Sequence, residues 1–200
     1  MGHHYEGDDL IVRKIRVGNM ENNTYVLECP ATHEALLVDG CFEADVILAE
    51  CKGAEIVGIV QTHAHHDHTD ALPALKDKLD VPLYAHPAED YPVPIEVELA
   101  DDDVISFGKD HEVRVLHTPG HTPGGVCLLT GNHLVSGDTL FPGGPGNTRG
   151  DKGLFKQIID GIENKLFTLP DDTSVYPGHG DDTTIGEEKP HLDEWKQRGW

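Results

Sequence analysis

The segment best suited to chemistry is HAHHDH, which begins at His63 and directly follows the apolar run EIVGIVQT. In an extended chain, side chains two positions apart project to the same side, so His63 and His65 can face one ion. Asp67 and His68 then lie at the start of an expected helix and can face a second point. Imidazole and carboxylate suit Zn²⁺, iron or Mn²⁺ as ligands. The segment therefore predicts a metal site rather than a solvated loop, with His66 pointing away from it.

Three further segments place imidazole or carboxylate groups directly after expected strands. They are HTPGHTPGG from His117, SGDTLF from Ser136 and YPGHG from Tyr176. Loops at strand ends are where a rigid sheet presents functional groups. Each segment alone is a weak signal, because a single aspartate or histidine in such a place is usually a turn or surface residue. Together with HAHHDH, they predict one site assembled from four strand ends.

The spacing of apolar residues predicts the elements that must position these segments. Short runs rich in β-branched residues predict strands at 11–17, 23–29, 34–40, 55–62, 81–86, 104–107, 111–117, 125–130, 133–138 and 173–178. Amphipathic spacing predicts helices at 43–52, 70–79, 154–169 and 190–197. The segments 87–103 and 141–151 have no clear period and are expected to be loops. This order favours an α+β fold of sheets with outer helices over an alternating parallel α/β fold.

The length of 200 residues is enough for one domain with a sizeable core. We expect residues 1–10 to form a flexible N-terminal tail and residues 11–200 to form a single domain. No stretch approaches the roughly 20 apolar residues that span a bilayer. The N-terminal segment is acidic and has no apolar core of a secretory signal, so a cytoplasmic location is expected.

The charge balance disfavours two classes of partner. Fifteen basic and 36 acidic residues give a formal net charge of −21. Binding to nucleic acid depends on lysine and arginine that neutralise phosphates, and binding to anionic membranes depends on them in the same way. Neither nucleic acid nor a membrane is therefore expected as a partner.

The four cysteines contain no C-x-x-C pair. In a 200-residue chain without a secretory signal, we expect them to be reduced. Cys29, Cys51 and Cys127 lie in or beside apolar segments and are expected in the core. Cys41 follows a strand ending in VDG and could lie near the site.

HAHHDH, HTPGHT, SGDTLF and YPGHG, in this order and spacing, resemble the motifs of the metallo-β-lactamase-fold hydrolases, most closely the compact type II glyoxalases (hydroxyacylglutathione hydrolases). The resemblance extends from about Ile11 to Trp195. It implies a four-layer αββα sandwich with the metal site at one edge of its two sheets. It also implies two divalent metal ions as cofactors, zinc first, with iron or manganese as the alternatives.

The same resemblance implies which residues bind each metal ion. His117 is not a ligand in the family pattern. The implied ligands are His63, His65 and His121 for the first ion, Asp67, His68 and His179 for the second, and Asp138 as a bridge between them.

Two divalent ions roughly 3.5–4 Å apart hold a bridging hydroxide, because metal coordination lowers the pKa of water. That hydroxide can attack a carbonyl carbon, and Asp67 can orient it or accept its proton as a catalytic residue. A thiolate leaves easily and needs little help from an acid. Together with the resemblance to type II glyoxalases, this implies hydrolysis of a small acyl-thiol, such as S-lactoylglutathione, to a 2-hydroxy acid and a thiol.

The sequence does not determine which thiol the substrate carries. In the loop after the bridging aspartate, the two-domain type II glyoxalases carry a lysine and an aromatic residue, and this chain has Asn147 and Arg149 at those positions. They also carry a tyrosine at the position of Asp181. Arg149 is the expected contact for an anionic substrate. One alternative is a persulfide dioxygenase-like oxidoreductase with a single iron held by His121, Asp138 and His63 or its neighbours; another is a lactonase of the same fold. The number of metal ions per chain separates the hydrolase from the dioxygenase.

Overall fold

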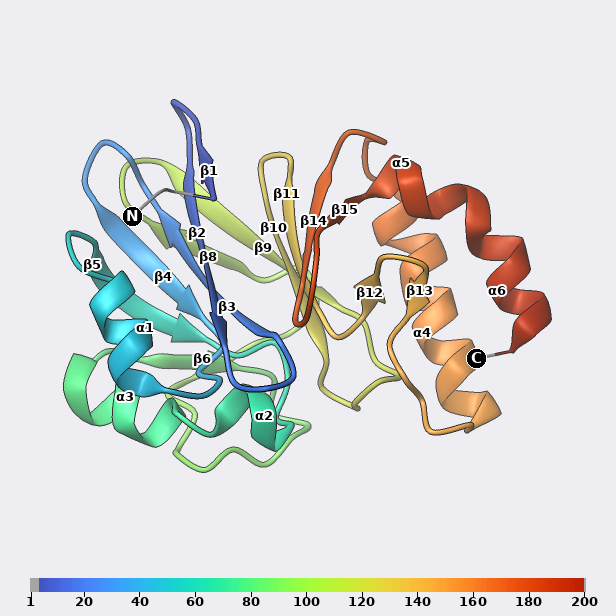
Figure 1. Ribbon diagram of the computed structural model, residues 1–200, viewed down its shortest axis with the longest axis horizontal. Coiled ribbons are helices and arrows are strands. Elements are labelled where there is room, and N and C mark those ends of the chain that lie inside the picture. The colour runs from blue at the N-terminus through green and yellow to red at the C-terminus, as the bar shows by residue number, and fades with distance from the viewer. Residues whose placement is uncertain (1–3, 200) are drawn as a thin grey trace.

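The computed structural model describes residues 4–199 and consists of two facing β-sheets with helices on both outer sides (Figure 1). The first sheet has seven strands in the order β1-β2-β3-β4-β5-β6-β7. These strands are β1 (Tyr5–Glu6), β2 (Ile11–Val17), β3 (Asn22–Glu28), β4 (Glu34–Val38), β5 (Glu55–Val60), β6 (Leu83–Ala85) and β7 (Val97–Glu98).

The second sheet has six strands in the order β15-β14-β11-β10-β9-β8. They are β8 (Val104–Phe107), β9 (His111–His117), β10 (Val126–Thr130), β11 (His133–Gly137), β14 (Ser174–Pro177) and β15 (Thr183–Thr184). A separate hairpin pairs β12 (Leu140–Phe141) with β13 (Gly144–Pro145).

Helices α1 and α3 lie on the outer side of the first sheet, and α4 and α6 lie on the outer side of the second (Figure 1). The helices are α1 (Ala44–Glu50), α2 (His66–Thr69), α3 (Leu72–Leu79), α4 (Lys152–Asn164), α5 (Ile185–Glu188) and α6 (Leu192–Arg198), with short 3-10 turns at Leu166–Thr168 and Lys189–His191. None of the helices within residues 4–199 is long and apolar enough to cross a membrane.

Three hydrophobic clusters fill the spaces between these four layers. The first lies between the two sheets and includes Tyr25 and Leu128. The second joins the first sheet to α1 and α3 through residues such as Leu37 and Leu75. The third joins the second sheet to α4 and α6 and includes Trp195. Because each sheet is covered on both faces, the architecture is the expected αββα sandwich.

The burial of β9 alternates over most of its length as its sequence does, and both β2 and β9 have the predicted bounds. The helix expected at 154–169 instead begins at Lys152, since the Asp151 side chain accepts hydrogen bonds from the amides of Gly153 and Leu154. It ends at Asn164, and a 3-10 turn follows. The helix expected at 70–79 is α3, which begins at Leu72, and a separate short helix, α2, precedes it and contains part of HAHHDH. The expected loop at 87–103 contains the short strand β7, which pairs with β6, and the expected loop at 141–151 contains most of the β12–β13 hairpin.

Residues 1–10 were expected to form a flexible tail. Residues 1–3 lie outside the described residues, and several of the others are ordered as part of the domain. Tyr5 and Glu6 pair with Val12 and Ile11 as an antiparallel strand, and Leu10 is buried in the core between the sheets. Backbone hydrogen bonding and apolar burial therefore extend the domain toward the N-terminus.

The four cysteines are free and buried, as the sequence predicts for Cys29, Cys51 and Cys127. Cys41 also lies near polar side chains at the edge of the first sheet, where its Sγ atom is 3.9 Å from Nδ1 of His68.

Candidate metal centre

The two sheets are joined by backbone hydrogen bonds at one edge, and the predicted site lies there. The amide of Val126 in β10 donates to the carbonyl of Thr62 after β5 at 2.9 Å. The amide of Asn23 in β3 donates to the carbonyl of Gly178 after β14 at 2.8 Å. Both β4–β5 and β11–β14 are parallel pairs, so the ends of their strands meet at this edge. The loops that follow β5, β9, β11 and β14 therefore converge.

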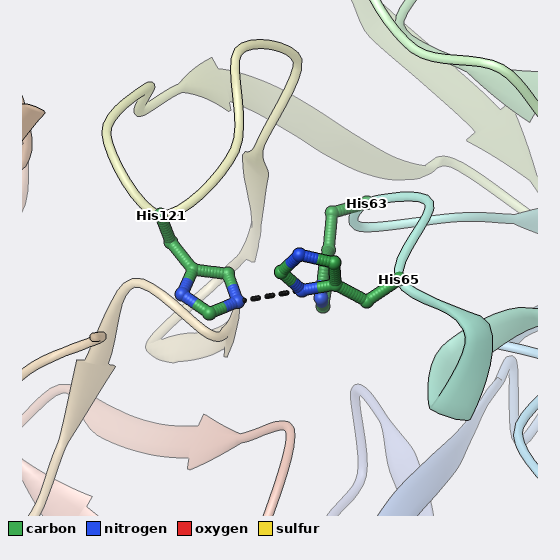
Figure 2. Close-up of side chains that lie close together, drawn as sticks. All are labelled: His63, His65 and His121. Carbon is green, nitrogen blue, oxygen red and sulfur yellow. Dashed lines mark hydrogen bonds between the residues drawn. The ribbon is translucent and has the colours of Figure 1, made fainter. Parts of the chain in front are cut away.

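The first cluster consists of His63, His65 and His121, whose ring nitrogens lie within 4.8 Å of one another (Figure 2). Nε2 of His121 is 2.9 Å from Nδ1 of His65. The rings of His63 and His121 are nearly perpendicular, with centroids 5.1 Å apart. The Nε2 atom of His63 is buried and has no hydrogen-bond partner in the described part of the chain. The three imidazoles thus converge on one point from two loops.

The second cluster consists of Asp67, His68 and His179, again with donor atoms within 4.8 Å of one another. Nε2 of His68 lies 3.1 Å from Nε2 of His179. Nε2 of His179 is also 3.3 Å from Oδ2 of Asp67. Asp67 and His68 are held by the short helix α2, which makes the predicted turn after the extended segment of His63 and His65.

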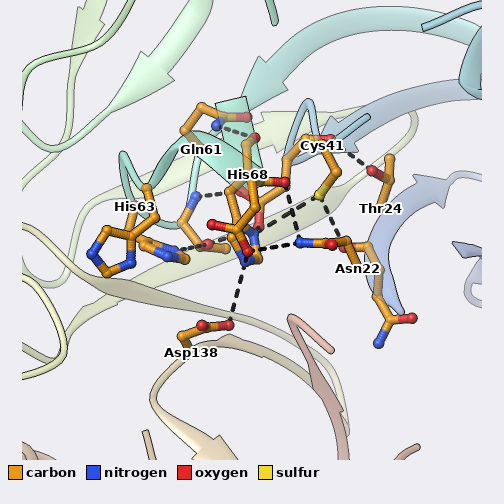
Figure 3. Close-up of polar contacts among 12 residues, drawn as sticks. Asn22, Thr24, Cys41, Gln61, His63, His68 and Asp138 are labelled. Carbon is orange, nitrogen blue, oxygen red and sulfur yellow. Dashed lines mark hydrogen bonds and ion pairs between the residues drawn. The ribbon is translucent and has the colours of Figure 1, made fainter. Parts of the chain in front are cut away.

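Asp138 lies between the two clusters. Its Oδ2 atom is 3.4 Å from Nε2 of His121 and 3.5 Å from Nε2 of His179. Its Oδ1 atom is 3.5 Å from Nε2 of His68 (Figure 3). The carboxylate can therefore reach a group bound at either cluster.

The donor set fits divalent metal ions. Two pairs of imidazole nitrogens face each other at hydrogen-bond distance, one pair in each cluster. Within residues 4–199, His63 Nε2 and Asp138 Oδ1 are buried without hydrogen-bond partners, an arrangement that costs about 1–3 kcal/mol per group. Imidazole with carboxylate is a ligand set for zinc, iron or manganese. A cation between these atoms would remove the cost.

Burial and charge shift the pKa values of the cluster residues in opposite directions. Burial holds the pKa of His63 well below its usual value. Burial also opposes protonation of His179, but the carboxylates of Asp138 and Asp67 outweigh it and raise the pKa of His179 to about 10. The hydrogen bond to His179 in turn holds the pKa of Asp67 far below its usual value. The paired charges of His179 and the two carboxylates therefore favour the observed arrangement of the second cluster.

The structure also identifies residues that the sequence analysis missed. Asp39, directly after β4, accepts hydrogen bonds from the Thr62 amide at 2.7 Å and from the Thr62 hydroxyl at 2.8 Å, and pairs with Nδ1 of His68 at 2.9 Å. Asn22, at the start of β3, donates to Oδ2 of Asp67 at 2.9 Å. An aspartate directly after a buried strand was the signal available for Asp39, whereas no local signal marks Asn22.

Two glycines let the backbone approach these groups. A Cβ atom at Gly178 would overlap the Asp138 carboxylate and lie 2.7 Å from Cε1 of His68. A Cβ atom at Gly146 would overlap the Asp138 carbonyl oxygen. Any side chain at either position would therefore displace Asp138.

The remaining predicted residues lie around the clusters. The His66 side chain is 82% exposed and outside both clusters, as expected. The exposed Arg149 lies near His65, where its charge contributes to lowering the pKa of that imidazole, after burial and the charge of His121. His117 is outside both clusters and stacks on His86, with centroids 4.2 Å apart.

Residues 17–179 match the model of the metallo-β-lactamase superfamily. An uncharacterised protein of Aquifex aeolicus (strain VF5) is 37% identical over 201 residues, covering 90% of this chain and 94% of that protein. A hydroxyacylglutathione hydrolase of Polaromonas sp. (strain JS666 / ATCC BAA-500) is 38% identical over 176 residues, covering 85% of this chain. This chain spans 66% of the length of that hydrolase.

Solved structures show the same fold. The BLEG-1 B3 metallo-β-lactamase superposes with a TM-score of 0.81 at 31% identity, covering 90% of this chain and 97% of that one. ETHE1 from Myxococcus xanthus gives a TM-score of 0.82 at 31% identity, covering 91% and 83%. TTHA1623 in a di-iron-bound form gives 0.75 at 30% identity, covering 88% and 96%. These matches confirm the family expected from the four motifs: the chain belongs to the metallo-β-lactamase superfamily.

Proposed function

We propose that this protein is a metal-dependent hydrolase of thioesters, acting on S-2-hydroxyacyl-thiols such as S-lactoylglutathione. The observation that carries the proposal is the pair of neighbouring clusters with Asp138 within reach of both. The similarity to a hydroxyacylglutathione hydrolase supports the choice of substrate class.

In this proposal the two clusters hold one divalent ion each, with zinc preferred and iron or manganese as the alternatives. The ligands are His63, His65 and His121 at the first cluster, Asp67, His68 and His179 at the second, and Asp138 between them. When bound, two such metal ions lower the pKa of water and polarise a carbonyl group.

Asp67 has the geometry for a catalytic role besides binding metal. Its Oδ2 atom accepts a hydrogen bond from Asn22 and faces His179, which fixes the orientation of the carboxylate. The side chain is 22% exposed, so a water molecule can reach it. In the proposed reaction, Asp67 orients the attacking water and accepts its proton.

Arg149 is the proposed contact for an anionic part of the substrate. Of the five arginines in the chain, Arg13, Arg16 and Arg114 form ion pairs with carboxylates. The exposed guanidinium of Arg149, by contrast, has no hydrogen bond or ion pair to any residue in 4–199. It is therefore available to a carboxylate on a ligand near His65.

A second candidate function is a persulfide dioxygenase with a single iron. The specific observation in its favour is that His63, His65 and His121, together with Asp138, offer a complete ligand set for one ion. In that case Asp67, His68 and His179 would bind no metal.

The test is hydrolysis of S-D-lactoylglutathione by the purified protein reconstituted separately with Zn²⁺, Mn²⁺ and Fe²⁺, together with the metal content of each sample. Two ions per chain and metal-dependent turnover that is lost in Asp138→Ala are the expected result. One iron per chain, no hydrolysis, and oxygen uptake with glutathione persulfide would establish the dioxygenase instead. If the protein binds two ions per chain but hydrolyses only lactones, the proposed metal centre would stand and the proposed substrate class would be wrong.

A further inference from the structure

Glu89 lies in the segment between β6 and β7, outside all four motifs, and is half-buried. Its Oε1 atom accepts a hydrogen bond from the Gly124 amide at 2.9 Å, and its Oε2 atom accepts one from the Ala64 amide. Ala64 stands between His63 and His65, and Gly124 is three residues after His121. A single carboxylate therefore connects the two loops that carry the first cluster.

These two loops belong to different sheets. The Ala64 loop follows β5 of the first sheet, and the Gly124 loop follows β9 of the second. Hydrogen bonds within one sheet therefore cannot set the distance between the imidazoles of His65 and His121. Hydrogen bonds to an ionised acceptor are about twice as strong as neutral ones. A carboxylate that accepts one from each loop is well placed to fix their separation.

The Gly124 loop is shaped to receive Glu89. A Cβ atom at Gly124 would lie 2.8 Å from Cγ of Glu89 and 3.1 Å from Nδ1 of His86, so only glycine leaves room for this approach. The preceding carbonyl, of Pro123, accepts a hydrogen bond from Nε2 of His117 at 2.9 Å, and His117 stacks on His86. Neighbouring contacts thus hold the loop where Glu89 meets it.

We propose that Glu89 is a positioning residue for the first cluster, holding His63, His65 and His121 in register across the two sheets. The inference rests on the proposed function only in taking these three histidines as metal ligands. Partners that orient metal ligands typically contribute 10–100-fold to metal affinity. Because Glu89 contacts neither Asp67, His68 nor His179, its effect should be confined to the first cluster.

The first experiment uses the wild-type chain without metal. Scalar coupling across hydrogen bonds, measured by NMR on isotope-labelled protein, should correlate the amides of Ala64 and Gly124 with the same side-chain carboxyl carbon, that of Glu89. Correlation of only one amide, or of neither, would overturn the proposal without reference to activity.

The second experiment compares Glu89→Gln with Asp90→Asn, an adjacent and exposed control. A glutamine amide can accept from one loop only and turns a donor toward the other. We expect zinc affinity at the first cluster, followed through the ring signals of His121, to fall about 10–100-fold. Affinity followed through His179 should stay within twofold, and Asp90→Asn should match the wild type at both clusters.

Gly124→Ala provides an independent variant. It keeps the Glu89 carboxylate but pushes it away from the loop, and it should weaken metal binding at the first cluster in the same way. Equal losses at both clusters, or no loss in either variant, would contradict the proposal. If S-lactoylglutathione is not hydrolysed but these affinities change as expected, the proposed function fails while the role of Glu89 stands.

Discussion

Asp39 and His68 form a hydrogen bond of 2.9 Å between Oδ2 and Nδ1, with both side chains almost completely buried. The bond is on the ring nitrogen opposite Nε2, which faces His179. Asp39 is itself fixed by the amide and hydroxyl of Thr62. This arrangement places the proton on Nδ1 of His68 and leaves Nε2 free to bind a metal.

Replacing this aspartate should weaken the second cluster. In Asp39→Asn, an amide donor can face the Nδ1 proton of His68, so we expect zinc affinity at the second cluster to fall about 10–100-fold. The unpaired buried group should also lower the free energy of unfolding by about 1–3 kcal/mol. Competitive zinc titration and urea denaturation measure the two effects. Asp45→Asn on exposed α1 is the control, and equal behaviour of the two variants would contradict the assigned role of Asp39.

Gly178→Ala should damage the site through Asp138. The added methyl group would overlap the Asp138 carboxylate and press on His68, so the carboxylate must move away from both clusters. We expect less than one tenth of the wild-type turnover and less than two ions per chain by elemental analysis, with an unchanged circular dichroism spectrum. Wild-type metal content in this variant would show that Asp138 does not need its observed position.

Gly161→Ala should stabilise the protein. Gly161 lies inside α4, and the nearest atoms to an added Cβ, those of Thr118, are 3.6 Å away, an ordinary contact distance. Glycine costs about 0.5–1 kcal/mol relative to alanine within a helix. Urea denaturation should therefore show a free energy of unfolding higher by about that amount, with unchanged turnover. A lower value would mean that the helix cannot accept the methyl group against the Thr118 loop.

Arg149→Gln should impair the use of anionic substrates. Removing the exposed guanidinium near His65 takes away a charged hydrogen bond to the ligand, so kcat/KM for S-lactoylglutathione should fall about tenfold. The change is expected mainly in KM, with metal content unchanged. Lys152→Gln, also exposed and close in sequence, tests for a general charge effect. Equal losses in the two variants would argue against a specific contact at Arg149.

Metal binding should release protons at neutral pH. In the metal-free protein, Asp138 and Asp67 raise the pKa of His179 to about 10, so this imidazole carries a proton at pH 7. A metal binds only the neutral ring, and affinity at the second cluster should therefore increase as the pH rises toward that value. Calorimetric titration in two buffers with different ionisation enthalpies gives the number of protons released. A value of zero would show that His179 is neutral before the metal binds.

Local sequence determined much of the fold. The strands at Ile11–Val17, Val104–Phe107 and His111–His117 have the predicted bounds, because a short run rich in β-branched residues is a property of each strand alone. Element ends were less predictable: α4 begins earlier than its apolar spacing indicates because the Asp151 side chain caps its first amides. The strand β1 was missed because a two-residue strand has no periodicity, and only pairing with β2 creates it.

The sequence by itself also determined which residues form the two clusters, because histidines and aspartates at strand ends form a recognisable order along the chain. Tertiary structure alone decided how they meet. Asp39, Asn22 and Glu89 act on atoms that are 23 to 45 positions away in sequence, at Thr62, at Asp67, and at Ala64 and Gly124. A single carboxylate or amide gives no local signal of its partner. Those contacts exist because the packing of the two sheets brings loops from different strands to the same edge.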